Sequence, residues 1–139
     1  MHRTKKIAVS HLAAPVFLLS AGSSLYYSLE ILWRGFSHWS MAVCGGLCLL
    51  LIYYMNRRLS SAFLLFRAAS GAVIITVVEL AAGCLFNLGL GLDIWDYSTH
   101  TLHLWGQISP YASARWFLLS IPVCWGCGWM ERHVFDPQG

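Results

Sequence analysis

The stretch AVIITVVELAAG at residues 72–83 places one acidic side chain, Glu79, in the middle of an apolar run. The residues on either side extend the run far enough to cross a bilayer. An ionisable side chain at that depth costs about 3 kcal/mol or more unless it faces a partner or a water-filled cavity. Glu30 repeats the pattern earlier in the chain, within LYYSLEILW at residues 25–33. The sequence therefore predicts a membrane protein with a polar site in its interior.

The composition supports the same class of protein. Of the 139 residues, 58% are hydrophobic and 11% are charged, and the mean hydropathy is +0.60. Soluble domains carry roughly 25% charged residues. Four apolar segments fill nearly the whole length, so we expect a single membrane domain over residues 1–139. The net charge of +3 lies at segment ends, which argues against the basic stripe that nucleic-acid binding requires.

The apolar segments predict an all-α fold, a polytopic four-transmembrane-helix bundle with a semi-ordered outer loop. We expect the helices at about residues 12–33, 39–55, 62–92 and 112–130. The third segment is long for one crossing, so we expect tilt or a break near Gly89 and Gly91. Each hairpin carries a Glu in its first helix and a Trp-containing outer loop, so a two-hairpin repeat is one interpretation.

The basic residues predict the orientation in the cell membrane. Those at the segment ends gather on one side of the predicted bundle: Arg3, Lys5, Lys6, Arg57, Arg58, Arg67 and Arg132. The opposite side holds Arg34, Asp93 and Asp96. By the positive-inside rule, both termini and the middle loop then lie in the cytoplasm. We expect an outer aromatic belt made of Trp33, Trp39, Trp95 and Trp105.

Glu79 is the strongest candidate for a functional side chain. It would bind a cation, a proton or a polar ligand, or else fix the packing of the helices as a buried acid. Gly83 and Asn87 follow at intervals of four and share its helix face. Arg115 is a candidate ionic partner, because it opens the last helix. Glu30 would either pair with Arg34 at i+4 or contribute to the same site.

The loop at residues 93–107 combines aromatic and polar side chains. Asp96 or Ser98 is expected to cap a short helix or to close a turn, and Tyr97 is suited to an interface. The loop is either an anchored segment or a lid over the polar face, with Gln107 completing it. His100 and His103 lack further ligands nearby, so no metal or other cofactor is expected.

The spacing of Cys124 and Cys127 is formally that of a redox or metal motif. The surrounding βα pattern of thioredoxin-like sites is missing from the sequence. We therefore interpret both cysteines as small buried apolar residues.

Several of these residues recur in an order that resembles a known family. The elements are Glu79, Gly83 and Asn87, then Trp95-Asp96-Tyr97-Ser98, Gly106-Gln107-Ile108 and Trp116, preceded by Glu30 to Gly35, His38 to Met41 and Gly45-Gly46. Together they resemble the type IV ABC-transporter (CmpB-like) family of small bacterial membrane proteins, from about Leu25 to Leu119. The resemblance implies a transport permease. The sequence has no Gly-x4-Gly-Lys-Ser/Thr phosphate loop, so ATP hydrolysis would require a separate ATPase or transporter subunit.

Three functions remain open at this point. The first is a small transporter or permease-like protein in contact with membrane lipids, whose ligand or ion would be bound by Glu79, Glu30, Asn87, Asp96, Tyr97, Ser98, Gln107 and Arg115. A homo-oligomer is expected, with small residues at Ala68, Ala72, Gly45 and Gly46 giving surfaces for close helix contact. The second is a membrane-embedded enzyme acting on a lipid-type substrate, with Glu79, Asp96 and His100 as acid–base candidates. The third is a structural or accessory subunit. No catalytic residue is assigned.

Overall fold

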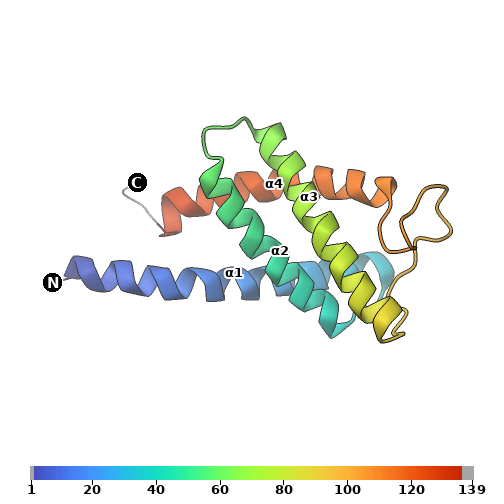
Figure 1. Ribbon diagram of the computed structural model, residues 1–139. Helices are drawn as coiled ribbons and strands as arrows, with labels where there is room; N and C mark the ends of the chain where they lie inside the picture. Colours follow the sequence, from blue (N-terminus) through green and yellow to red (C-terminus); the bar gives the residue numbers. More distant parts are fainter. Residues whose placement is uncertain (1, 136–139) are drawn as a thin grey trace.

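The protein is a bundle of four helices, as predicted (Figure 1). The computed structural model describes the backbone of residues 2–135 and the side chains of residues 13–134. The helices are α1 (His2–Arg34), α2 (Trp39–Arg58), α3 (Leu64–Ala82) and α4 (Pro110–Met130). Two π-helical turns continue them, η1 (Gly83–Gly89) after α3 and η2 (Glu131–Phe135) after α4.

The helix ends differ in part from those expected. α1 begins at His2 rather than near Leu12, whereas its candidate membrane span begins at Ala13. The apolar pattern marks the part suited to a bilayer, and a helix of 33 residues, about 50 Å long, continues beyond it. α3 ends at Ala82 and passes into η1, so the regular helix stops before the break expected near Gly89. Ser109 caps α4, and Pro110 takes its first position.

Three segments are long and apolar enough to cross a membrane: Ala13–Arg34, Trp39–Arg58 and Leu64–Gly89. α4 carries Arg115 and two prolines and is not among these three. It packs along α3 and also contacts α2. The side chains of Arg3, Lys5 and Lys6 lie outside the described residues, as do residues 136–139.

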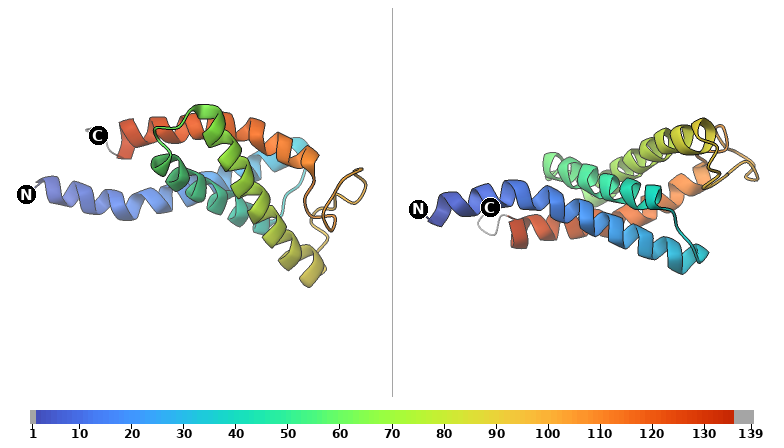
Figure 2. Two further views of the ribbon diagram at one scale, coloured as in Figure 1. Left: turned by 45° about the horizontal axis from the view of Figure 1, so that its top comes forward. Right: turned by 90° about the horizontal axis from the view of Figure 1, so that it is seen from below.

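The bundle consists of two hairpins, α1 with α2 and α3 with α4, and α2 joins them by contacting both α3 and α4. Residues 35–38 and 90–109 lie at one end of the bundle, which we call the loop end (Figures 1 and 2). The start of α1 and the end of α4 lie together at the opposite end. This arrangement places both ends of the described chain on one side.

Small residues bring α1 and α2 into close contact. A Cβ built on Gly22 would lie 2.7 Å from the carbonyl oxygen of Gly45, and one on Gly46 would lie 2.6 Å from that of Leu19. Ala68 and Ala72 are also buried inside the bundle. These small residues were expected to serve contacts between copies of the chain. They serve contacts within it, because side-chain size alone does not tell which helix approaches.

The hydrophobic core lies toward the opposite end and is formed by Leu18, Ile52, Tyr53, Cys124 and Cys127. Both cysteines are free and buried, which agrees with their interpretation as small apolar residues. A smaller cluster of Met41, Ala82 and Trp95 lies near the loop end.

Polar contacts tie three helices together at the opposite end. The Tyr53 hydroxyl donates a hydrogen bond to Glu131, and Arg57 pairs with the same carboxylate at 3.1 Å. Arg67 of α3 donates to Asn56 Oδ1 of α2 at 2.7 Å. α2 is thereby fastened to α3 and to the continuation of α4. We call these five residues the polar clamp.

Candidate functional site

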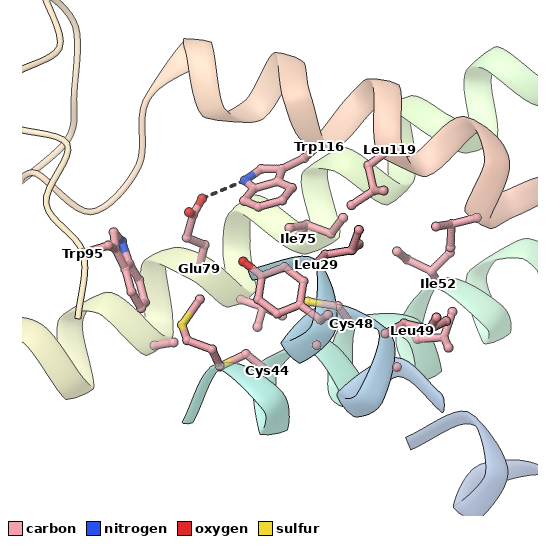
Figure 3. A pocket seen from close by; sticks show the side chains of 18 residues that line it. Leu29, Cys44, Cys48, Leu49, Ile52, Ile75, Glu79, Trp95, Trp116 and Leu119 are labelled. Atoms are coloured by element: carbon pink, nitrogen blue, oxygen red, sulfur yellow. Dashed lines mark hydrogen bonds between the residues drawn. The ribbon is translucent and has the colours of Figure 1, made fainter. Parts of the chain in front are cut away.

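Glu79 lies inside the bundle on α3, with 9% of its surface exposed. The Tyr97 hydroxyl donates a hydrogen bond to Oε1 at 2.6 Å. Trp116 Nε1 donates to Oε2 at 2.9 Å (Figure 3). One donor comes from the loop and the other from α4. The carboxylate is therefore held by two neutral donors, each on a different oxygen.

Arg115 does not form the ion pair with Glu79 that the sequence suggested. Within the described side chains, the ion pairs of glutamates are Arg34–Glu30 and Arg57–Glu131. The Arg115 guanidinium instead lies 5.2 Å from the ring centroid of Tyr111 and 5.9 Å from that of Trp116. Neighbouring helix positions are turned by about 100°, so position 116 rather than 115 meets Glu79. Apart from its place in the family motif, no feature of the sequence indicated that Trp116 is this partner.

Glu30 forms the local pair expected from its spacing. Its carboxylate lies 3.5 Å from Arg34 and accepts a hydrogen bond from the Tyr26 hydroxyl at 3.0 Å. Arg34 also donates to the carbonyl oxygen of Ile94 at 3.1 Å, which connects α1 to the loop. The negative charge of Glu30 is thus balanced within its own helix.

Asn87 fastens the loop to η1. Its Oδ1 accepts from the backbone N–H of Ile94 at 2.7 Å, and its Nδ2 donates to Trp95 O at 3.0 Å and to Gln107 Oε1 at 2.8 Å. Isolated π-helical turns are rare and occur frequently at functional sites. Here the turn carries a buried amide whose oxygen and nitrogen are both used by the loop.

Gln107 lies against Gly83 at the start of η1. A Cβ at Gly83 would approach Gln107 Oε1 to 2.5 Å, so only glycine leaves room for this side chain. The carbonyl oxygen of Gln107 accepts from Trp95 Nε1 at 3.0 Å. Trp95 is therefore buried under the loop, with 8% of its surface exposed, and is not part of an outer belt. The sequence pattern did not reveal that the Trp95 indole bonds to a carbonyl oxygen inside the protein. The other three tryptophans of the expected belt, Trp33, Trp39 and Trp105, are exposed.

Asp96 and Ser98 form the turn predicted for them. The Asp96 carboxylate accepts from the backbone N–H and from the hydroxyl of Ser98, each at 2.8 Å. These hydrogen bonds, the backbone one first, hold the pKa of Asp96 below its ordinary value. Gly106 passes close by with φ of +71°, and the Tyr97 N–H donates to its carbonyl oxygen at 2.7 Å. The turn therefore fixes the position from which Tyr97 reaches Glu79.

Tyr97 stays protonated in this setting. Burial raises the pKa of its hydroxyl above the ordinary value, and the neighbouring carboxylate of Glu79 raises this pKa further. His100 lies 5.3 Å from the Tyr97 ring, and its Nδ1 lies 3.2 Å from Ser109 Oγ. His103 Nδ1 accepts from the Gly106 N–H instead of facing His100. Among the described residues, three or more His, Cys, Asp or Glu side chains nowhere converge in a metal-binding arrangement.

Two hollows meet at Glu79. The first, which we call the apolar cavity, has a volume of about 110 Å³ and is lined mainly by carbon atoms of all four helices, among them Leu25, Leu49, Ile75, Val78 and Leu119 (Figure 3). The second, which we call the polar pocket, has a volume of about 400 Å³ at the loop end and includes Glu30, Arg34, Asp96, Tyr97, His100 and Arg115. Tyr26, Met41, Glu79, Trp95 and Trp116 line both.

The candidate residues therefore fall into two groups. Those in the polar pocket are Glu30, Glu79, Asp96, Tyr97 and Arg115. Asn87, Gln107 and Ser98 lie outside it and hold the loop in place through their hydrogen bonds. The sequence did not separate side chains that line the pocket from those that support it.

Comparison with known proteins gives one match. The model of the family described as "Putative ABC-transporter type IV" matches residues 23–134. Searches of curated proteins and of solved structures found no match. The matched range contains α2, α3, α4, the loop and every residue of the two hollows except Gly22. It covers most of the chain, which therefore belongs to this family of ABC-transporter-related membrane proteins.

Proposed function

We propose that this protein is a small permease-like transporter whose solute binds at Glu79. The observation that carries the proposal is that Glu79 lines both the apolar cavity and the polar pocket. A transporter needs a binding group within the membrane that can be reached from one side at a time. Glu79 lies on a spanning segment and faces a pocket at the loop end. Away from the polar pocket, Ile52 lines the apolar cavity and also belongs to the hydrophobic core around Leu18.

The cost of burying a charge in a spanning helix favours a functional carboxylate over one that serves only helix packing. An acid in a spanning helix is costly, and such residues mark ion or substrate pathways by default. Helix packing at this position would be served as well by an amide, which accepts and donates hydrogen bonds without a charge. Glu79 meets two neutral donors rather than a cation, so its charge is available to a solute or a proton.

The hydrogen bonds around Glu79 suit reversible protonation. An indole N–H only donates, so Trp116 needs Oε2 as an acceptor in every state. A tyrosine hydroxyl both donates and accepts. When Oε1 takes up a proton, the Glu79–Tyr97 hydrogen bond can reverse its direction without a change in position. Glu79 can thus exchange a proton while it keeps both contacts, which supports coupling of solute movement to protons.

The test is solute-driven proton movement in proteoliposomes that contain a pH-sensitive dye. Solutes of several classes, namely metal cations, organic cations, organic anions and sugars, are added outside in turn. We expect at least one class to change the internal pH with the wild type and to have no such effect with Glu79→Gln. Glu131→Gln, in the polar clamp, is the control for a half-buried acid outside the site. No change of internal pH with any class of solute, or equal changes with Glu79→Gln and the wild type, would contradict the proposal.

The assembly and orientation are further parts of the proposal. We propose that the loop end faces outward, that the protein acts as a homo-oligomer, and that a separate ATPase or transporter subunit supplies any ATP-driven step. The family description supports a transport partner. Native mass spectrometry from membranes tests both associations, and a monomer without partners would contradict them.

A further inference from the structure

We infer that the solute is an amphiphilic organic ammonium ion, whose charged head lies against Glu79 and whose alkyl part lies in the apolar cavity. The inference rests on the proposed function and names the solute class for the same site. It follows from the way in which one carboxylate joins two hollows of opposite character.

The charge at the junction favours a cation. Each Glu79 oxygen accepts one hydrogen bond from a neutral donor, and a carboxylate has about four acceptor positions. Glu30 in the same pocket is already paired with Arg34. Asp96 also lines the pocket with one hydrogen bond on each oxygen, but it is exposed. Glu79 is therefore the buried acid of the pocket with acceptor positions to spare, and Arg115 acts on it through its charge without forming an ion pair.

Aromatic rings surround this carboxylate. Trp95 and Trp116 lie on either side of Glu79 (Figure 3), and Tyr26 lies 6.2 Å from Trp116 between ring centroids. Organic ammonium ions bind to aromatic faces through the ring quadrupole, and cages of such rings recognise quaternary ammonium groups. Rings combined with one carboxylate suit a bulky, weakly hydrated cation better than a metal ion, which prefers several oxygen ligands.

The apolar cavity accounts for the rest of the ligand. Its walls are alkyl and aromatic side chains together with the thiols of Cys44 and Cys48. An apolar cavity of about 150 Å³ takes up benzene, so one of about 110 Å³ admits a short alkyl segment. A hydrophilic cation would leave this volume without contacts.

The position of Arg115 favours an anionic head group instead of a cationic one. The test must therefore compare ligands whose head groups differ in charge. Its Nε is buried without a hydrogen-bond partner among the described residues, and its guanidinium lies over the Trp116 ring. A head group with a negative charge would bind there. Probes with the same alkyl part and different heads distinguish Glu79 from Arg115 as the binding group.

The probes are hexyltrimethylammonium, hexyl sulfate and 1-hexanol, added to the purified full-length protein in lipid nanodiscs, with binding measured by isothermal titration calorimetry. We expect saturable binding of hexyltrimethylammonium, about tenfold tighter than that of either other probe. Glu79→Gln should remove this preference while 1-hexanol binding stays unchanged. Tighter binding of hexyl sulfate, or an unchanged preference in Glu79→Gln, overturns the inference.

Protons should compete with the cation. The titratable or charged groups that line the hollows around Glu79 are Tyr26, Glu30 and Arg34 on α1, Cys44 and Cys48 on α2, Asp96, Tyr97 and His100 in the loop, and Arg115 on α4. Hexyltrimethylammonium should therefore bind more weakly in acid, and its binding should release protons in the wild type and not in Glu79→Gln. Binding that strengthens in acid overturns the inference.

Two matched pairs of variants test the alkyl part. Val78→Phe fills the apolar cavity, whereas Val77→Phe adds the same side chain to an exposed position, 60% accessible, on the same helix. On α4, Leu119→Phe narrows the cavity and Leu118→Phe does not. We expect Val78→Phe and Leu119→Phe to weaken all three probes relative to their partners. If Val78→Phe does not fold, the comparison of Leu119→Phe with Leu118→Phe still tests the inference. Equal binding within both pairs overturns the inference.

The two proposals fail separately. Proton movement with another solute class, together with no hexyltrimethylammonium binding, refutes the ammonium ligand and leaves transport standing. Selective binding of hexyltrimethylammonium without any proton or solute movement refutes transport and leaves the binding site standing.

Discussion

Gly83 and Gln107 lie so close together that no β-carbon fits at position 83. A Cβ there would come within 2.5 Å of Gln107 Oε1 and 2.9 Å of Gln107 Cβ. Gln107 in turn receives a hydrogen bond from Asn87 and accepts one from Trp95 through its carbonyl oxygen. The contact between Gly83 and Gln107 therefore determines how closely the loop approaches Glu79.

Substitution of Gly83 by Ala should loosen the loop. The added methyl group has to displace Gln107, and overpacking of this kind costs about 1–3 kcal/mol. We expect faster hydrogen–deuterium exchange over residues 94–107 and weaker binding at Glu79. Gly126→Ala is the control, because nothing lies within 4 Å of a Cβ at that position. If both variants exchange alike, the contact does not hold the loop.

Substitution of Asn87 by Ala should release the loop more strongly. The Ile94 N–H and Gln107 Oε1 both lose a partner, and each unsatisfied buried group costs about 1–3 kcal/mol. We expect the amide of Ile94 to exchange rapidly with deuterium. Asn56→Ala, at the polar clamp, should leave this amide protected. Protection of Ile94 in Asn87→Ala would show that the loop is held by other contacts.

Cysteine labelling tests the orientation of the bundle. Thr99 is exposed in the loop, and Ser60 is exposed between α2 and α3 at the opposite end. A membrane-impermeant maleimide added to intact cells should label Thr99→Cys and should label Ser60→Cys only after permeabilisation. The wild type, with its native cysteines, serves as the blank. The reverse pattern would invert the topology.

The turn at Asp96 should weaken in acid. Its folded pKa is lowered by hydrogen bonds from Ser98, so the stabilisation is complete above the ordinary carboxyl pKa, near 3.8, and is lost as the pH falls through the lower folded value. Hydrogen exchange at the Ser98 amide should therefore rise in that acidic range. In Asp96→Asn, the exchange should show no such rise beyond its intrinsic pH dependence. A rise of the same size in both proteins would mean that Asp96 does not control the turn.

The apolar runs were sufficient to predict the fold class, and three of the four expected spans coincide with segments long and apolar enough to cross a membrane. Helix ends were harder, because α1 continues past the apolar part that made it recognisable. The π-helical turn after Ala82 was not anticipated either. Sequence spacing treats every helix as regular, whereas this turn is stabilised by contacts with residues that follow it in the chain.

The site was predictable where partners lie on one helix and less so where they lie on different ones. The Glu30–Arg34 pair follows from a spacing of four. Trp116 as the partner of Glu79 depends on how α4 is rotated against α3, which no local pattern encodes. The same limit explains why Arg115 was expected as the partner and why Trp95 was assigned to an exposed belt.

The polar clamp has a mechanical consequence. It fixes α2 to α3 and to the continuation of α4 at the end remote from the loop, and the glycines at 22, 45 and 46 hold α1 against α2. The two hairpins are thus joined at the clamped end. A rotation of one hairpin against the other about that end would displace most the loop end, where Glu79 meets Tyr97 and Trp116. Such a rotation would act chiefly on the hydrogen bonds that Tyr97 and Trp116 donate to Glu79.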